Sequence, residues 1–215
     1  MPWHQSPVTA RLTAVAAVTS SCLALTACSA GNADSAPADP HGQLAHLRIA
    51  APGSSAGYSR ARFGTGWVDT DHNHCDTRND ILARDLTNLR RRGQCTVTAG
   101  TLHDRYTGKT LTFRRGSASA LVQIDHIYPL HRMWVMGAAQ WSLAQREKAA
   151  NDRRNLLAVD GSANEAKGDQ GPAEWMPQRE ERCGYATRYI TVATAYRLPI
   201  TTADKTALGR MLATC

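Results

Sequence analysis

The pattern of apolar and polar positions predicts short helices and strands in mixed order. Apolar residues at helical spacing predict a helix over residues 76–91, which Gly93 would end. Two alternating segments, at residues 96–102 and 110–113, flank a turn-forming segment at 106–109 and predict a β-hairpin. No internal repeat is visible, and the mixture of elements predicts the α+β class.

The second half of the chain continues this mixture. A strand over residues 121–124 leads directly into Asp125-His126, and a second short apolar strand is predicted at 155–159. The helical or partly helical segments of this half lie at residues 138–150, 164–167, 190–195 and 203–212. The chain therefore leaves one strand, makes a helical excursion and returns as a second strand.

The first 27 residues have the features of a signal peptide. Residues 12–27 are apolar or small and carry no charge, and 16 residues are fewer than the ~20 that a membrane-spanning helix needs. This segment ends in Leu25-Thr26-Ala27-Cys28, which resembles the lipobox of bacterial lipoproteins, where the cysteine is acylated. We expect an exported protein with residues 1–27 removed and a lipid anchor at Cys28. The alternative is an ordinary signal peptide and simple secretion.

Composition places a flexible tether after the signal peptide and a folded domain after the tether. Residues 28–45 are small and polar with two prolines, which is typical of a tether, and residues 46–215 form the predicted domain. The chain is 42% hydrophobic, which excludes a disordered protein. Lys and Arg outnumber Asp and Glu by 25 to 18, so the net charge is +7. This charge fits a nucleic acid or an anionic lipid surface, and it also fits a basic protein with neither partner.

Export determines the expected state of the cysteines. Four cysteines remain after Cys28, and an oxidising compartment favours two disulfides among them. Their order along the chain favours the pairs Cys75–Cys95 and Cys183–Cys215. A zinc site is the alternative, but the spacing contains no C-x-x-C pair.

Candidate catalytic chemistry is concentrated between residues 125 and 167. Neighbouring residues on a strand point to opposite faces, so Asp125 and His126 can reach different partners, such as a metal ion and a water molecule. Asn164 begins a predicted helix, and Lys167 lies one turn later on the same face, where it can reach a phosphate. Carboxylate and amide oxygens with open positions suit Mg²⁺ or Mn²⁺.

This arrangement resembles the HNH nuclease superfamily, whose core is the ββα-metal fold. The three letters of the motif would be His126, Asn155 and Asn164. Asp-His-Ile-x-Pro-Leu, Asn-Leu-Leu-Ala-Val and Asn-x-x-Lys-Gly-Asp together are similar to exported bacterial HNH proteins that share a domain with the C-terminal part of GmrSD-type restriction enzymes. The resemblance covers most of residues 58–215. It implies a ββα-metal core at about residues 120–170, with flanking helices, a β-hairpin and disulfides.

The resemblance also implies a role for each motif residue. Asp125 and Asn164 match metal ligands, and His126 matches the general base that takes a proton from the attacking water. Asn155 matches a residue that braces the loop between the strands, and Lys167 matches a phosphate contact. A divalent ion, Mg²⁺ or Mn²⁺, is the implied cofactor. Outside the motif, Arg78 is a candidate for a phosphate contact or an ion pair.

Two functions follow, of different kinds. The first is a monomeric, surface-anchored endonuclease that acts on nucleic acid, with DNA favoured over RNA. The second is a catalytically silent HNH-fold lipoprotein that binds a partner or polymer. The retention of Asp125, His126 and Asn164 favours the first. Separately, a calcium-like loop is formed by Asp69, Asp71, Asn73 and Asp80, although His74 stands where such loops have glycine.

Overall fold

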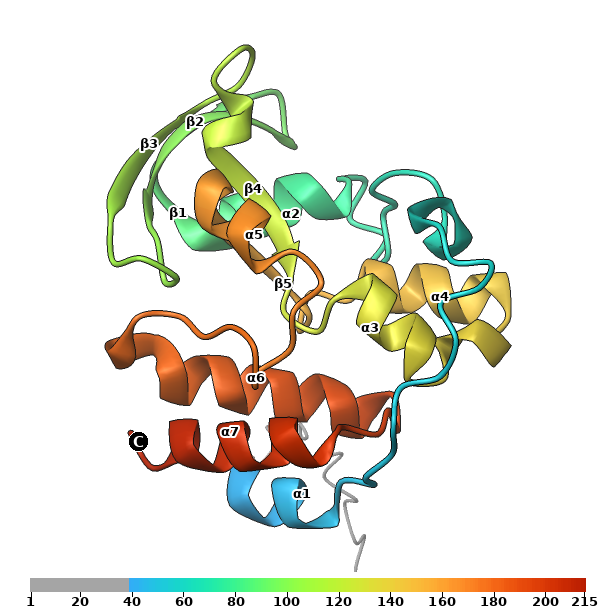
Figure 1. The fold of residues 1–215 in the computed structure, drawn as a ribbon. Helices are drawn as coiled ribbons and strands as arrows, with labels where there is room; N and C mark the ends of the chain where they lie inside the picture. Colours follow the sequence, from blue (N-terminus) through green and yellow to red (C-terminus); the bar gives the residue numbers. More distant parts are fainter. Residues whose placement is uncertain (1–38) are drawn as a thin grey trace, which may run out of the picture. The chain divides into compact units, whose positions relative to one another are not determined.

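The computed structural model describes residues 39–215 and confirms the α+β class (Figure 1). The elements, in chain order, are α1 (Pro40–His46), η1 (Arg60–Phe63), α2 (Thr77–Asp85), β1 (Leu86–Arg92), β2 (Thr96–His103), β3 (Thr110–Arg114), η2 (Ser119–Leu121), β4 (Val122–His126), α3 (Leu130–Val135), η3 (Ala138–Gln140), α4 (Leu143–Ala150), β5 (Leu156–Asp160), α5 (Gly161–Lys167), η4 (Arg179–Glu181), α6 (Arg182–Ala195) and α7 (Thr202–Leu212). Within residues 39–215, none of these helices is both long and apolar enough to cross a membrane.

The strands form two separate antiparallel sheets. Strands β1, β2 and β3 make a three-stranded sheet in that order, and β4 pairs with β5 as a two-stranded hairpin. The hairpin and α5 lie between the three-stranded sheet and the α6–α7 pair (Figure 1). The hairpin is therefore covered on both faces, and all five residues of β5 are buried. This explains why its sequence is a continuous apolar run rather than an alternating one.

Each face of the β4–β5 hairpin belongs to a different hydrophobic core. Leu157 and Val159 pack in the core that includes α6 and α7, and Leu156 and Ala158 pack in the core that includes α2 and the three-stranded sheet. Facing residues in an antiparallel pair share a face. Asp125 lies opposite Leu157 and therefore faces the α6 side, and His126 lies opposite Leu156 on the other side. The two packed faces determine where the motif side chains point.

The helix predicted over residues 76–91 is wrong in its second half. Asp76 caps α2 by accepting a hydrogen bond from the Asn79 N–H at 2.8 Å, but the helix ends at Asp85. The chain continues as β1, in which Leu86 pairs with Leu102 of β2. Strand β2, from later in the chain, forms hydrogen bonds with the backbone N–H and C=O groups of this segment. This pairing outweighs the helical spacing of its apolar residues.

Several other expectations are confirmed. The predicted hairpin is β2–β3, and the disulfides are Cys75–Cys95 and Cys183–Cys215, with sequence separations of 20 and 32 residues. In the chain-entropy view, each closed loop of this length stabilises the fold by about 3 kcal/mol. The pairing uses all four cysteines, so none of them remains for zinc.

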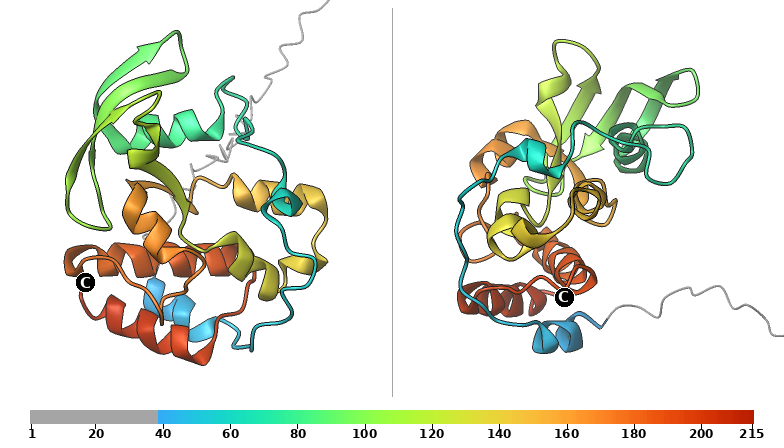
Figure 2. Two further views of the ribbon diagram at one scale, coloured as in Figure 1. Left: turned by 45° about the horizontal axis from the view of Figure 1, so that its top comes forward. Right: turned by 90° about the vertical axis from the view of Figure 1, so that its right-hand side faces the viewer.

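The N-terminal part of the described chain packs on the C-terminal helices. Helix α1 begins at Pro40, inside the range 28–45 that we predicted as a tether, and Asp39 caps it. It lies against α6 and α7, as both views in Figure 2 show. The predicted signal peptide and the candidate lipid anchor at Cys28 lie outside the described residues, and both stay predictions.

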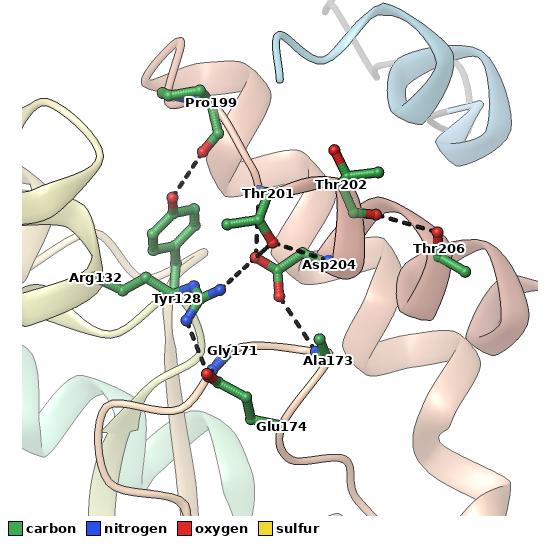
Figure 3. Close-up of polar contacts among 10 residues, drawn as sticks. All are labelled: Tyr128, Arg132, Gly171, Ala173, Glu174, Pro199, Thr201, Thr202, Asp204 and Thr206. Atoms are coloured by element: carbon green, nitrogen blue, oxygen red, sulfur yellow. Dashed lines mark hydrogen bonds and ion pairs between the residues drawn. The ribbon is translucent and has the colours of Figure 1, made fainter. Parts of the chain in front are cut away.

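A polar network holds the segment after β4 against the C-terminal helices (Figure 3). Arg132 on α3 forms an ion pair with Asp204 of α7, and Asp204 is fully buried. The Nη1 atom of Arg132 also lies 3.1 Å from Oε2 of Glu174. The Tyr128 hydroxyl donates to the carbonyl of Pro199 at 2.9 Å. The loop that leaves the candidate site is therefore tied to distant parts of the chain.

Candidate active site

Asp125 lies in a buried, charged cluster on the α6 side of the hairpin. Lys167 Nζ is 2.9 Å from Asp125 Oδ2 and 3.1 Å from Oδ1, and the Tyr106 hydroxyl donates to Oδ2 at 2.5 Å. Asp125 is 6% exposed, and Lys167 is fully buried. Burial raises the pKa of Asp125 above its usual value, and the contacts with Lys167 and Tyr106 oppose this shift. The carboxylate is thus held by two donors, one of them a cation.

Lys167 links this cluster to the backbone of His126. Besides its contacts with Asp125, its Nζ donates to the His126 carbonyl at 2.9 Å. The buried ammonium therefore donates to both the Asp125 carboxylate and a backbone carbonyl. Helix α5 presents Lys167 in its last turn, after Asp160 has capped the first turn by accepting from the Ala163 N–H at 2.9 Å. Lys167 therefore joins α5 to the end of β4.

His126 lies on the opposite face and is oriented by a backbone carbonyl. Its Nε2 is 2.8 Å from the carbonyl oxygen of Ala150, at the end of α4. A carbonyl only accepts, so Nε2 carries the hydrogen and Nδ1 of the neutral ring keeps its lone pair. Burial lowers the pKa of His126 to about 3, so the ring is neutral near pH 7. Trp67 stacks on the ring with a centroid distance of 6.0 Å and an interplanar angle of 11°.

A small cavity adjoins the His126 ring. Its volume is about 90 Å³. The residues that line it are Arg60, Phe63, Gly64, Gly66, Trp67, His126, Leu130 and Ala150. Most of these come from the segment before α2, and the others come from the end of β4, the start of α3 and the end of α4. His126 is only 5% exposed, so most of its ring is covered by protein. A reactant that approaches the ring would therefore occupy this cavity.

Asn155 contacts the loop that follows His126. Its Oδ1 accepts from the Tyr128 N–H at 2.7 Å, and its Nδ2 donates to the Tyr128 carbonyl at 3.1 Å. Its own carbonyl accepts from the Ile127 N–H at 2.8 Å. Asn155 is fully buried, and its side chain satisfies two backbone groups that have no strand partner.

Asn164 lies on α5 and contacts the strand that carries Asp125. Its Nδ2 donates to Gln123 Oε1 at 2.7 Å. Gln123 is two residues before Asp125 and shares its strand face. Within residues 39–215, no donor is bonded to Asn164 Oδ1. Asn164, Gln123, Asp125 and Lys167 therefore belong to one face of the hairpin, while His126 belongs to the other.

The donors on this face match a hard divalent cation in type. Asp125 supplies a carboxylate and Asn164 supplies a carboxamide oxygen, and Mg²⁺ is commonly bound by one or two carboxylates with waters and substrate phosphates. No group of three or more His, Cys, Asp or Glu side chains in the described part could hold a metal ion. Asp125 and Asn164 match an ion that takes its other ligands from water or substrate. Such an ion would need Lys167 to release part of the Asp125 carboxylate.

Two other predicted sites lie apart from this cluster. Arg78 Nη2 is 3.4 Å from the carbonyl of Val122, at the start of β4, and burial lowers its pKa. In the calcium-like loop, Asp69 accepts from the backbone N–H groups of Asn73 and His74, and Asp71 pairs with Arg153 at 2.9 Å. The loop's own donors and a nearby arginine thus occupy these acidic oxygens.

Three residues of the site were not anticipated from the sequence. Tyr106 lies in the turn between β2 and β3, and Arg60 and Trp67 lie in the segment between α1 and α2. An aromatic side chain inside a polar turn was the available signal for Tyr106. No local pattern indicated that Arg60 or Trp67 would reach His126.

Comparison with known proteins identifies the relatives of this chain. Residues 76–211 match the family described as "GmrSD restriction endonucleases, C-terminal domain". The chain is 41% identical over 175 residues to a protein of Arthroderma benhamiae named "Uncharacterized secreted protein", covering 80% of this chain and 82% of the relative. No solved structure matches. The matched range begins at the cap of α2 and contains β4, β5 and α5, so the segment with Arg60 and Trp67 precedes it.

Proposed function

Since the chain belongs to the family of GmrSD restriction endonuclease C-terminal domains, we propose that it is an HNH-type nuclease that hydrolyses phosphodiester bonds. The observation that carries this proposal is the state of His126. Its Nε2 is fixed by the Ala150 carbonyl, so its Nδ1 is the basic atom, and a cavity adjoins the ring. Strands β4 and β5 with α5 would form the ββα unit, at about residues 120–170.

His126 would act as the general base. Its Nδ1 lone pair would accept a proton from the attacking water, while Ala150 and Trp67 hold the ring in place. A pKa of about 3 makes the buried ring a weak base, and efficient bases have a pKa near the working pH. A bound phosphate brings negative charge beside the ring and raises that pKa. The substrate itself would therefore activate the base.

Asp125 and Asn164 would hold the divalent ion, Mg²⁺ or Mn²⁺, which stabilises charge on the phosphate oxygens and on the leaving alkoxide. Lys167 would leave part of the Asp125 carboxylate, and its ammonium would then be free to contact phosphate. Asn155 would brace the loop after His126 through its two bonds to Tyr128.

We propose an extracellular site of action. The two disulfides and the secreted relative support it. Anchoring through Cys28 is part of this proposal, and simple secretion is the alternative. The proposed substrate is nucleic acid, with DNA favoured over RNA, and the proposed form is a monomer.

A specific observation favours a second function, that of a catalytically silent HNH-fold lipoprotein that binds a partner or polymer. Lys167 and Tyr106 hold the Asp125 carboxylate, and His126 is nearly buried. A site that stays closed in this way would not turn over substrate. In a silent protein, the charged cluster would serve only to stabilise the fold.

Degradation of plasmid DNA and of RNA by the purified mature protein separates these functions. The nuclease proposal expects cleavage with Mg²⁺ or Mn²⁺, no cleavage with a chelator, and loss of cleavage in His126→Ala. His103→Ala is the matched control, because His103 is an exposed histidine on β2 whose ring, within residues 39–215, forms a hydrogen bond only with Thr110. Absence of cleavage by the wild type with every divalent ion would overturn the nuclease proposal and support the silent protein.

A further inference from the structure

The cavity beside His126 contains an arginine with no acidic partner. Arg60 begins η1 and is exposed, and within residues 39–215 its guanidinium forms no ion pair or hydrogen bond. Arg60 and His126 line the same cavity. Most other arginines around the site contact a carboxylate or a carbonyl, as Arg84, Arg132, Arg146 and Arg153 do.

The other walls of the cavity leave an approach from solvent. Gly64 and Gly66 have positive φ values of 89° and 84°, and no atom lies within 4 Å of the place where a side chain on Gly66 would begin. Glu147 packs against Gly64, but it forms no ion pair with Arg60. A side chain at Gly66 would therefore begin in open space.

The chemistry of the cavity matches a small anion. Its wall carries one guanidinium and one neutral imidazole, and Phe63 and Leu130 supply apolar surface. About 10–15 Å³ is enough for one water molecule, so a cavity of about 90 Å³ has room for a phosphate group. A guanidinium binds phosphate through two parallel hydrogen bonds, and its charge persists at every physiological pH.

We propose that Arg60 binds the substrate phosphate beside His126, and that Arg60, Phe63 and Trp67, which precede the matched family domain, complete the active site. This inference rests on the proposed nuclease function. Of the phosphate contacts expected from the sequence, Arg78 donates to the Val122 carbonyl, and Lys167 would reach phosphate only after it leaves part of the Asp125 carboxylate. Arg60 lines the His126 cavity, and within residues 39–215 its guanidinium forms no hydrogen bond or ion pair.

Kinetics of Arg60 variants on a DNA duplex test this inference. Arg60→Ala should lower kcat/KM by about 10²–10³-fold, the usual effect of removing one donor to the developing charge. The kcat/KM of Arg60→Lys should lie between those of Arg60→Ala and wild type, because lysine keeps the charge but loses the paired hydrogen bonds. Arg62→Ala is the matched control, since Arg62 is exposed and lies two residues away. Within residues 39–215, its backbone groups bond to Ser59 and Arg146, and its guanidinium forms no hydrogen bond or ion pair. This variant should stay within about threefold of wild type.

DNA binding in the presence of a chelator gives a readout that does not depend on cleavage. A phosphate contact contributes about 0.7–0.9 to the slope of log affinity against log salt, so Arg60→Ala should reduce the slope by that amount and Arg62→Ala by less. Equal kinetics and equal slopes for the two variants would overturn the role of Arg60, even if the wild type cleaves DNA. If the wild type does not cleave, the nuclease proposal fails, and unchanged binding in Arg60→Ala would overturn the phosphate site as well.

Discussion

Replacing Lys167 with methionine removes a buried cation and keeps a side chain of similar length. The variant leaves the Asp125 carboxylate, which is 6% exposed, with Tyr106 as its remaining partner. Removing one member of a buried ion pair typically costs 3–5 kcal/mol, because the other charge is left uncompensated, so we expect a loss of about 3–5 kcal/mol. For a domain of this size, this corresponds to a decrease in Tm of roughly 6–20 °C.

Thermal and denaturant unfolding of four proteins would measure this effect: wild type, Lys167→Met, Asp125→Asn and the double variant. Asp125→Asn removes the uncompensated charge, so the double variant should be more stable than the sum of the single losses predicts. Groups in contact typically show coupling of about 0.5–3 kcal/mol, and we expect a value in the upper part of this range.

The pH dependence supplies a second check with a definite sign. Burial raises the pKa of Asp125, and the loss of Lys167 raises it further, because that contact opposes the shift. A carboxyl whose pKa is higher in the folded state binds more protons there, so stability rises as the pH falls through that pKa. The deficit of Lys167→Met relative to wild type should therefore shrink between pH 7 and pH 4. If Lys167→Met loses less than about 1 kcal/mol of unfolding free energy at pH 7, or if the loss grows on acidification, the stabilising role of the Asp125–Lys167 ion pair is refuted.

Three further predictions concern the site and the fold. His126→Ala should lower cleavage by about 10²–10⁴-fold while metal and DNA binding persist, measured by single-turnover cleavage and titration calorimetry; cleavage at the wild-type rate would exclude His126 as the base. Asn155→Ala should leave the buried N–H and carbonyl of Tyr128 unsatisfied, at about 1–3 kcal/mol each, and calorimetry should show a lower Tm. Replacing Cys183 and Cys215 together with serine should cost about 2–5 kcal/mol in denaturant unfolding, and an unchanged midpoint would contradict the stabilising role of that disulfide.

Short-range order in the sequence determined several features of this protein. The adjacency of Asp125 and His126 on a strand predicts that they face opposite sides, and the register with Leu157 and Leu156 agrees. The order of the four cysteines predicted the observed pairs. The motif around Asn155 and Asn164 led to the family that the comparison identifies. These features depend on spacing within one element or on residue chemistry, and both are readable along the chain.

Only the tertiary structure decided which groups surround the motif residues. Tyr106 reaches Asp125 from the turn of another sheet, and Trp67 and Arg60 reach His126 from a segment about 60 residues earlier in the chain. Long-range pairing with β2 also converted the end of a predicted helix into β1. The physical reason is the same in each case. Periodicity and motif spacing report on neighbours within a few residues, whereas burial and strand pairing select partners from the whole chain.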